Sequence, residues 1–360
     1  MKLPKPINIK IKKYSGDANH LKKKMIKVKL SANESALGPS PKALKEYQRV
    51  LKNLKRYPDS QGLILKKTLA KNFKINPKQI ILGAGSDQIF ELICRLFLKK
   101  NDEVIVSKFS FIIYRMYSIM NSAKVKYAKE NNYNTSVDNI LSCVTKKTKI
   151  VFIANPNNPT GTLISKKELL ELRKKLRSNI LLVIDDAYFE YVNKKSFSSG
   201  LQLFSNYKNV IVTRTFSKLY GLASLRIGWA YGPKNIVQNL EKIRPPFNVN
   251  TPAIFASSAS IKDKKWAKRE IKHVDKWKKI FFKVFKKLKI ETNETNANFF
   301  LLNFNRKKIT SDSVFKALLN SGILLRRMNI YNIKNSLRVT IGNTIENKKF
   351  ISKIKKLCNV

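Results

Sequence analysis

The sequence has very few histidines and cysteines. Its 360 residues include two histidines, His20 and His273, and three cysteines that form no Cys-x-x-Cys pair. Two distant histidines argue against a histidine-based metal site and against a Ser-His-Asp triad. An odd number of scattered cysteines argues against a disulfide framework and a zinc site, and is typical of a reducing compartment. We therefore expect no metal centre.

Long apolar runs are also absent. The longest, residues 109–120, is interrupted by Arg115, whereas a membrane-spanning helix needs about 18 or more consecutive apolar residues. The first 14 residues carry charge but lack the apolar segment of a secretory signal. We therefore expect a cytoplasmic protein with no membrane partner.

Acidic residues are scarce, since 23 Asp and Glu stand against 73 Lys and Arg, for a net charge of +50. This charge raises nucleic-acid binding as one hypothesis, in the form of a nucleic-acid-binding chain on an inactive enzyme fold. The lysines, however, are spread along the whole chain and outnumber the arginines, which read bases better. Composition bias is the simpler explanation, so we expect no nucleic-acid partner, although the positive field would attract an anionic substrate.

Between about residues 60 and 232, short apolar segments alternate with amphipathic ones. The strand-like segments are 79–83, 103–107, 124–128, 149–155, 180–186 and 209–215. Buried strands that alternate with helices predict an α/β fold, with a mainly parallel sheet sandwiched by helices. In such sheets ligands bind beyond the carboxyl ends of the strands.

The pattern changes after Pro245-Pro246. Residues 252–290 are predicted to be helical, and strand-like and helical segments then mix up to residue 342. We expect a large domain at 46–260 and a smaller α+β domain formed by 1–45 together with 261–360.

Two polar motifs that follow predicted strands each allow two interpretations. GAGSD (83–87) opens a helix, where glycines and free backbone N–H groups suit an anion, but the same residues could be a plain N-cap. NPNNPTG (155–161) is either a rigid turn or a turn that directs the Asn158 amide at a ring oxygen of a ligand.

Charged residues end two further strands. Asp185 follows an apolar strand, where a carboxylate is costly unless a cation or a metal pairs with it, and Tyr188 lies within reach of the same pocket. An ion pair between sheet and helix explains Asp185 equally well. Lys218 follows the next strand among apolar residues, where desolvation would lower its pKa and make it a nucleophile. Thr215 and Arg226 could bracket a phosphate; alternatively, the lysine head reaches out to water.

Taken together, these residues match the requirements of pyridoxal phosphate. Lys218 would form the Schiff base, and Asp185 would keep the pyridine nitrogen protonated so that the ring accepts electrons. Asn158 and Tyr188 would bond the ring oxygen.

Ten sequence blocks carry a resemblance to a known family. They are LSANESALGPSPKAL (30–44), RYPD (56–59), GAGSDQIFEL (83–92), ANPNNPTGT (154–162), DDAYFEYV (185–192), TRTFSKLYGLASLRIGWAYGP (213–233), PPFNVNTPA (245–253), ANFFL (297–301), GILLRR (322–327) and LRVTIG (337–342). The chain resembles the fold-type I aminotransferases, which use pyridoxal 5'-phosphate, and within them the histidinol-phosphate aminotransferase family. One departure is Ala36, where many relatives have proline, so the segment over the site is expected to be less rigid.

The resemblance implies a role for each matched residue. Lys218 carries the Schiff base and moves the proton, Asp185 pairs with the pyridine nitrogen, and Phe111 stacks on the ring. The residues that would hold the phosphate are Gly85, Ser86, Asp87, Thr215, Ser217 and Arg226. Tyr57 would reach the phosphate in a neighbouring subunit, which implies a homodimer with shared sites.

The same resemblance implies the substrate contacts and the reaction. Arg338 would bind the carboxylate of glutamate or 2-oxoglutarate, Arg326 (or, as a competing choice, Arg327) would bind a second anionic group, and Asn33 would contact substrate. The implied reaction exchanges an amino group between L-histidinol phosphate and 2-oxoglutarate in histidine biosynthesis. An aromatic amino-acid aminotransferase and a threonine-phosphate decarboxylase share the fold and remain alternatives.

Overall fold

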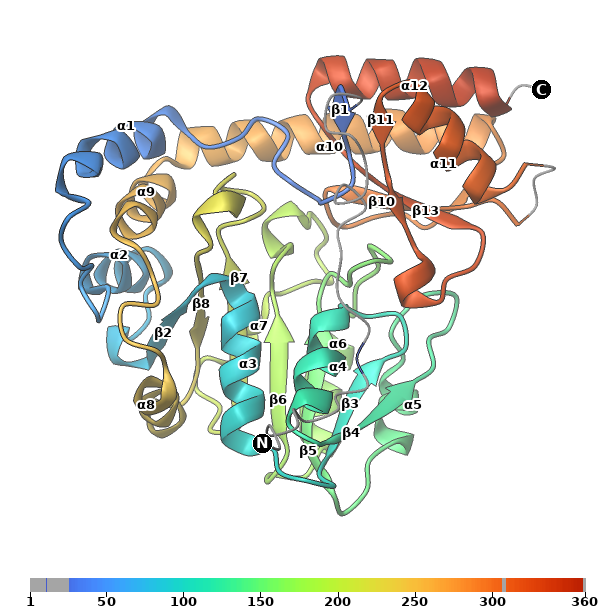
Figure 1. Cartoon of the computed structure of the whole chain (residues 1–360). Coiled ribbons are helices and arrows are strands. Elements are labelled where there is room, and N and C mark those ends of the chain that lie inside the picture. Colours follow the sequence, from blue (N-terminus) through green and yellow to red (C-terminus); the bar gives the residue numbers. More distant parts are fainter. Residues whose placement is uncertain (1–10, 12–25, 306–308, 359–360) are drawn as a thin grey trace, which may run out of the picture.

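The computed structural model describes residue 11 and residues 26–305 and 309–358 (Figure 1). His20 and most of the predicted N-terminal part of the small domain lie outside these residues. No helix in the described ranges is long and apolar enough to cross a membrane.

Within the described ranges, the central element is a seven-stranded sheet with the strand order β2-β8-β7-β6-β5-β3-β4. The bounds are β2 Ile80–Gly83, β3 Glu103–Ser107, β4 Lys124–Ala128, β5 Thr148–Ala154, β6 Leu181–Asp185, β7 Val210–Thr215 and β8 Gly228–Tyr231. Only β8 runs against its neighbours, because it pairs antiparallel with both β2 and β7, while the other pairs are parallel. The prediction of a mainly parallel sheet is confirmed; β8 was not predicted.

Both faces of this sheet are buried under helices. Along β6, Leu182 and Ile184 belong to one apolar cluster and Leu181 and Val183 to another, as the alternation of side chains along a strand requires. Helices contributing to the first cluster are α1 Pro41–Val50, α2 Leu63–Phe73, α5 Val137–Ser142, α6 Lys166–Lys175, α7 Gly200–Phe204 and α9 Thr251–Lys262. Helices contributing to the second are α3 Gly85–Phe97, α4 Ile112–Met120 and α8 Lys234–Ile243.

The C-terminal elements form a separate layer. An antiparallel sheet with the order β12-β13-β10-β9 and a parallel pair, β1 with β11, pack beside helices α10 to α12. Their bounds are β1 Val28–Lys29, β9 Glu291–Thr292, β10 Phe299–Asn303, β11 Ile323–Leu324, β12 Arg326–Arg327, β13 Ser336–Thr340, α10 Lys264–Lys287, α11 Ser311–Asn320 and α12 Thr344–Cys358. Single-turn 3-10 helices are η3 Leu51–Asn53, η4 Pro77–Gln79, η5 Phe189–Tyr191, η6 Ala223–Leu225 and η7 Asn329–Tyr331. Figure 1 shows α10 running from the end of α9 to this layer.

The predicted helical stretch 252–290 is interrupted at one residue. Asp263 separates α9 from α10, and its carboxylate accepts a hydrogen bond from the backbone N–H of Trp266, 3.4 Å away, as an N-cap does. The predicted domain boundary at residues 260/261 falls next to this break, and the boundary at 45/46 falls inside α1. The two domain boundaries stay predictions.

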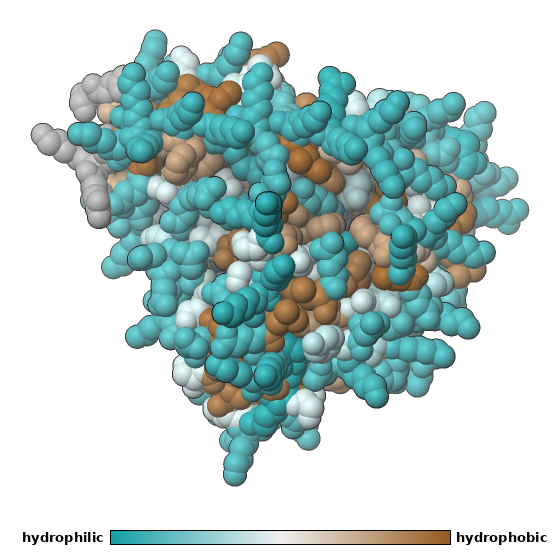
Figure 2. All heavy atoms as spheres, turned by 180° about the vertical axis from the view of Figure 1, so that it is seen from behind, coloured by the Kyte–Doolittle hydropathy of each residue, from teal (hydrophilic) through white to brown (hydrophobic). Residues whose placement is uncertain are grey.

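Hydrophilic side chains cover most of the molecular face in Figure 2, and apolar residues appear between them in separate areas. This distribution fits a chain in which 27% of the residues are charged.

Candidate active site

A cavity of about 390 Å³ lies at the carboxyl ends of the central strands. It brings together residues from the N-terminal segment, the large sheet and the C-terminal layer, as expected for an α/β sheet. Of the predicted site residues, those lining the cavity are Asn33, Gly85, Ser86, Asp87, Phe111, Asn158, Asp185, Tyr188, Thr215, Ser217, Lys218, Arg226, Arg326 and Arg338. Tyr57 does not line it.

Asp185 ends β6 at the floor of the cavity and is 5% exposed. Its Oδ2 atom accepts a hydrogen bond from the hydroxyl of Tyr114 at 2.6 Å, and Oδ1 accepts one from the backbone N–H of Ala187 at 3.1 Å. Burial raises the pKa of Asp185 to about 7, the Tyr114 hydrogen bond opposes this rise, and the neighbouring Asp186 adds to it. A cation placed against this carboxylate would reverse the rise.

Lys218 follows β7 and is half-buried at the wall of the cavity. Its Nζ donates a hydrogen bond to the backbone carbonyl of Ala32, 3.1 Å away, and lies 5.8 Å from the ring centre of Tyr188. The amine therefore faces the space between the N-terminal segment and the large sheet. The lowered pKa expected for Lys218 stays a prediction.

The start of α3 forms a shallow cradle at one end of the cavity. Gly85 has a positive φ of 77°, and a Cβ atom added there would lie 2.6 Å from Nη2 of Arg226. A Cβ atom added to Gly228 would lie 2.4 Å from the backbone nitrogen of Ser86. Since no side chain caps α3 at Ala84, the first N–H groups of this helix and the Arg226 guanidinium are arranged to receive an anion.

Asp87 lies at the same end of the cavity but with the wrong charge for a direct phosphate contact. Its Oδ2 atom is 3.3 Å from Nη2 of Arg226. Burial raises the pKa of Asp87, and the positive charges of Arg226 and Lys218 oppose the rise. The carboxylate thus orients Arg226, and only the backbone of Asp87 suits an anion. On the facing loop, the Thr215 hydroxyl accepts a hydrogen bond from the Ser217 N–H at 3.1 Å.

The N-terminal segment holds the Tyr188 hydroxyl through Asn33. The Asn33 amide Nδ2 donates to the Tyr188 hydroxyl oxygen at 3.0 Å, and Asn33 is itself 1% exposed. Thr340 in β13 fixes Asn33, because its hydroxyl accepts from the Asn33 N–H at 2.9 Å and donates to the Asn33 Oδ1 at 3.2 Å. Asn33 therefore orients the Tyr188 hydroxyl as well as lining the cavity.

Two arginines from the C-terminal layer complete the lining. Arg338 donates from Nη1 to Oδ1 of Asn158 and from Nη2 to the Ser31 carbonyl at 2.9 Å, while its buried Nε has no hydrogen-bond partner among the described residues. Arg326 lines the cavity as well. Arg327, the competing choice, packs over the Phe315 ring at 3.9 Å outside the cavity lining, so the geometry favours Arg326.

Tyr57 lies at the surface, with 83% of its area exposed. Its ring stacks on Phe247, with ring centres 4.8 Å apart and planes inclined by 23°. Among the residues that the structure describes, Tyr57 is not part of the cavity lining.

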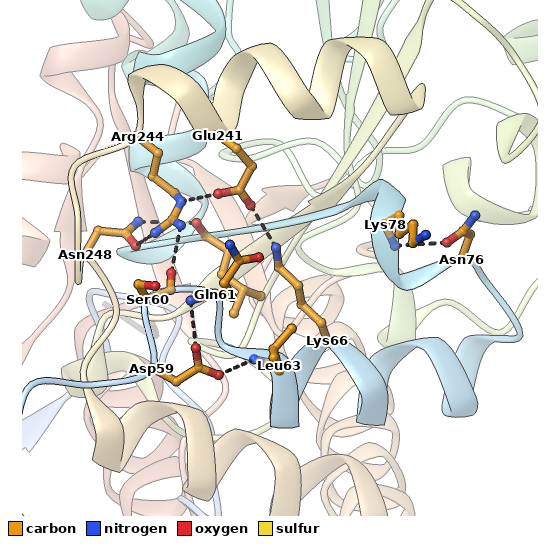
Figure 3. Close-up of polar contacts among 11 residues, drawn as sticks. Asp59, Ser60, Gln61, Leu63, Lys66, Asn76, Lys78, Glu241, Arg244 and Asn248 are labelled. Atoms are coloured by element: carbon orange, nitrogen blue, oxygen red, sulfur yellow. Dashed lines mark hydrogen bonds and ion pairs between the residues drawn. The ribbon is translucent and has the colours of Figure 1, made fainter.

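A polar network supports the segment that follows Tyr57 (Figure 3). Arg244, at the end of α8, donates to the Ser60 carbonyl at 2.8 Å and to Glu241 at 2.6 Å. Glu241 also accepts from Lys66 of α2 at 2.8 Å. Asp59 accepts from the backbone N–H of Leu63, the first residue of α2, at 2.7 Å. Segment 59–63 is thus tied to α8.

The same network continues to the cradle. Arg244 donates to Oδ1 of Asn248 (Figure 3), whose Nδ2 donates to Oε1 of Gln88 at 2.6 Å. That Gln88 oxygen also accepts from the Ala84 N–H at 2.8 Å, directly before the first residue of α3. A continuous chain of hydrogen bonds therefore links Ser60 to the start of the cradle.

The sequence interpretation missed several residues of the site. Tyr114 carries the shortest contact to Asp185, and Ser31 and Tyr331 add to the cavity lining. The sequence could have indicated Tyr114 through its spacing, because it lies three residues after Phe111, about one turn further along helix α4.

Comparison with known proteins shows which family the chain belongs to. Residues 25–354 match the family described as aminotransferase class I and II. The chain belongs to this family. Its aminotransferase relatives include a histidinol-phosphate aminotransferase from Pelagibacter ubique (strain HTCC1062), 49% identical over 360 residues and covering 100% of both chains. Another from Rhodopseudomonas palustris (strain TIE-1) is 42% identical over 315 residues, which are 87% of this chain and 86% of that one.

Solved structures of aminotransferases share the fold. One is the histidinol-phosphate aminotransferase of Sinorhizobium meliloti in complex with pyridoxal-5'-phosphate, with a TM-score of 0.87, 22% identity and coverage of 93% of this chain and 91% of that one. An aspartate aminotransferase variant from Thermus thermophilus has a TM-score of 0.82 at 17% identity, covering 92% and 96%. This confirms the predicted fold-type I architecture.

Proposed function

We propose that the chain is a pyridoxal-phosphate-dependent aminotransferase acting on L-histidinol phosphate in histidine biosynthesis. It would transfer the amino group to 2-oxoglutarate, giving imidazole-acetol phosphate and L-glutamate. The observation that carries this proposal is the 49% identity over the full length to a histidinol-phosphate aminotransferase. The arrangement of donors and acceptors in the cavity supports it.

The cavity residues fit the cofactor. The cradle at Gly85 has no room for a side chain beside Arg226, and it offers backbone N–H groups to a phosphate. Asp185, raised in pKa by burial, gains a partner in a protonated pyridine nitrogen. When bound, pyridoxal phosphate supplies an electron sink for the negative charge that develops at the substrate Cα.

The other residues would orient the cofactor and move one proton. Lys218 would be the covalent anchor, and its Nζ, once released, would take the proton from the substrate Cα and deliver it to the cofactor carbon C4′. Tyr188, held by Asn33, donates its hydroxyl proton to the ring oxygen, and Asn158 donates its amide to the same atom. Phe111 would cover the ring face.

The two arginines would select anionic substrates. Arg338 is already fixed by Asn158 and Ser31, so its guanidinium is oriented for the carboxylate of glutamate or 2-oxoglutarate. Arg326 would bind the second anionic group, the substrate phosphate or the distal carboxylate, with Asn33 as a further contact to substrate.

The active form would be a homodimer. The side chains that support this are exposed and apolar, and they lie on α1, η3 and the segment after it, α2 and the loop before α9. They are Leu44, Leu51, Leu54, Tyr57, Leu63, Ile64 and Phe247. Burying them against a second copy would remove apolar area from water, and would carry Tyr57 to the phosphate of the partner's site. We further propose a cytoplasmic location, since the sequence has an odd number of cysteines, three, and no Cys-x-x-Cys pair, a usage typical of a reducing compartment.

Absorption spectroscopy tests the proposal. The wild-type protein, saturated with pyridoxal phosphate, should show the visible band of a lysine-bound cofactor, and L-histidinol phosphate should bleach it. Lys218→Ala should lack that band, whereas Lys29→Ala, which removes another lysine of the same cavity, should keep it.

The outcomes separate the alternatives. A band that responds to phenylalanine but not to histidinol phosphate would make the protein an aromatic amino-acid aminotransferase. Carbon dioxide released from O-phosphothreonine would make it a decarboxylase. The absence of any band in the presence of cofactor would refute the enzyme proposal.

A further inference from the structure

Tyr114 is buried behind the cavity, in contact with the carboxylate that the proposed function places against the cofactor. It is fully buried, and its hydroxyl donates to Oδ2 of Asp185 at 2.6 Å. Its ring stacks on Phe152, with ring centres 4.9 Å apart and planes at 2°, and meets Phe90 edge-on at 4.9 Å. The ring is therefore clamped, and the direction of the hydroxyl is fixed by packing.

The two carboxylate oxygens of Asp185 have different surroundings. Oδ1 accepts from the Ala187 N–H at 3.1 Å and from the Thr213 hydroxyl at 3.4 Å. Oδ2 accepts from Tyr114. Donors on both oxygens thus hold the carboxyl group against rotation about its Cβ–Cγ bond, with Tyr114 holding Oδ2, while Asp185 still lines the cavity.

The charges around Asp185 would otherwise favour its neutral form. Asp186 and Asp87 both raise its pKa, in addition to burial. Asp186 is partly offset by Arg214, 3.3 Å away. Among the contacts that oppose the rise, the Tyr114 hydrogen bond is the largest. The pKa of Tyr114 is itself raised well above its ordinary value by burial and by Asp185, so the hydroxyl remains a donor over the working pH range.

We propose that Tyr114 is a positioning residue that keeps Asp185 ionised and aimed into the cavity, so that this carboxylate can hold a proton on the cofactor's pyridine nitrogen. The inference rests on the proposed function. The aromatic cluster of Tyr114, Phe152 and Phe90 would then do more than fill space, because it holds the Tyr114 hydroxyl against Asp185.

The decisive variant is Tyr114→Phe, which removes one oxygen atom and keeps the packing. The matched control is Tyr117→Phe on the same helix, α4, whose side chain does not line the cavity. We expect Tyr114→Phe to lower kcat by about tenfold, the effect of losing one hydrogen bond to a charged group. We expect KM to change little and the acid limb of the kcat profile to move to higher pH. Tyr117→Phe should leave the profile in place.

A double-mutant cycle distinguishes positioning from packing. Tyr114→Phe should weaken cofactor binding in the wild-type background, and in an Asp185→Asn background it should cause no further loss of cofactor affinity, because the carboxylate it acts on is gone. An equal loss in both backgrounds would overturn the proposal, and so would a Tyr114→Phe pH profile identical to the wild type.

A measurement on the cofactor-free protein tests the role of Tyr114 independently of the proposed function. In the cofactor-free protein, Tyr114→Phe should raise the pKa of the Asp185 carboxyl, measured by carbon-detected NMR with Asp185→Asn for assignment. If the wild type binds no pyridoxal phosphate, the proposed function fails. The titration still decides whether the Tyr114 hydroxyl controls the ionisation of Asp185. An unshifted carboxyl titration would show that Tyr114 only packs.

Discussion

Substituting Gly85 by alanine tests whether the cradle at α3 binds an anion together with Arg226. The added Cβ atom would lie 2.6 Å from Nη2 of Arg226, so the guanidinium, at the end of a flexible side chain, must move. Gly38 provides a matched control. It has nearly the same φ, 73° against 77°, but a Cβ atom added there meets nothing within 4 Å.

The two substitutions should share one effect and differ in another. Each places an L-residue in the left-handed region, which costs about 1 kcal/mol of folding free energy. Only Gly85→Ala displaces Arg226, and losing a charge-assisted hydrogen bond to a phosphate costs roughly 1.5–3 kcal/mol, or about 10- to 150-fold in affinity. We therefore expect similar losses of stability but a large loss of cofactor affinity in Gly85→Ala alone.

Two assays separate these effects. Urea unfolding of the cofactor-free proteins gives the loss of stability, and titration with pyridoxal phosphate, followed by its absorption, gives the dissociation constant. If both variants bind the cofactor equally well, Arg226 does not contact the phosphate and the cradle assignment is wrong. A much larger loss of stability in Gly85→Ala would mean that Arg226 cannot move aside, contrary to the reasoning.

Three other outcomes are expected. Gln88→Leu leaves the Ala84 N–H without its acceptor and removes one of the two acceptors of the Asn248 amide, so urea unfolding should report a loss of about 1–3 kcal/mol, accompanied by weaker cofactor binding. Because the folded-state pKa of Asp185 is about 7 against an ordinary 3.8, its contribution to the stability of the cofactor-free protein is complete below about pH 4 and is lost as pH rises through 7. Asp185→Asn should remove this pH dependence from urea unfolding. Tyr57→Ala should weaken dimerisation in analytical ultracentrifugation and lower cofactor affinity; an unchanged dimer and affinity would contradict the shared-site proposal.

Strands β3, β5, β6 and β7 could be predicted because burial on both faces makes them largely apolar runs. Segment 103–107 coincides with β3, and segment 209–215 differs from β7 by one residue. β8 could not be predicted in this way, since its four residues follow a long loop and run antiparallel. The break at Asp263 depends on one side chain capping the next helix, and the residues around it are helical on both sides.

The residues of the site could be predicted where strand ends determine their position. Asp185 ends β6 and Lys218 follows the neighbouring parallel strand β7, so both side chains line the cavity at the same edge of the sheet. Tyr114 could not be predicted, because its contact depends on the rotation of α4 against the sheet. The contact between Asn33 and Tyr188 spans 155 residues of sequence, and no local pattern specifies it.

The distance along the sequence between Asn33 and Thr340 has a consequence for biosynthesis of the protein. These residues, 307 positions apart, are joined by hydrogen bonds that hold the Tyr188 hydroxyl in place through Asn33. A ribosome adds about 5–20 residues per second, so the large sheet can form well before β13 emerges. Asn33, in the N-terminal segment, cannot form its hydrogen bonds to Thr340 until the C-terminal part of the chain has been synthesised. The emerging polypeptide therefore gains a cofactor-binding sheet first and a finished substrate site only when synthesis is nearly complete.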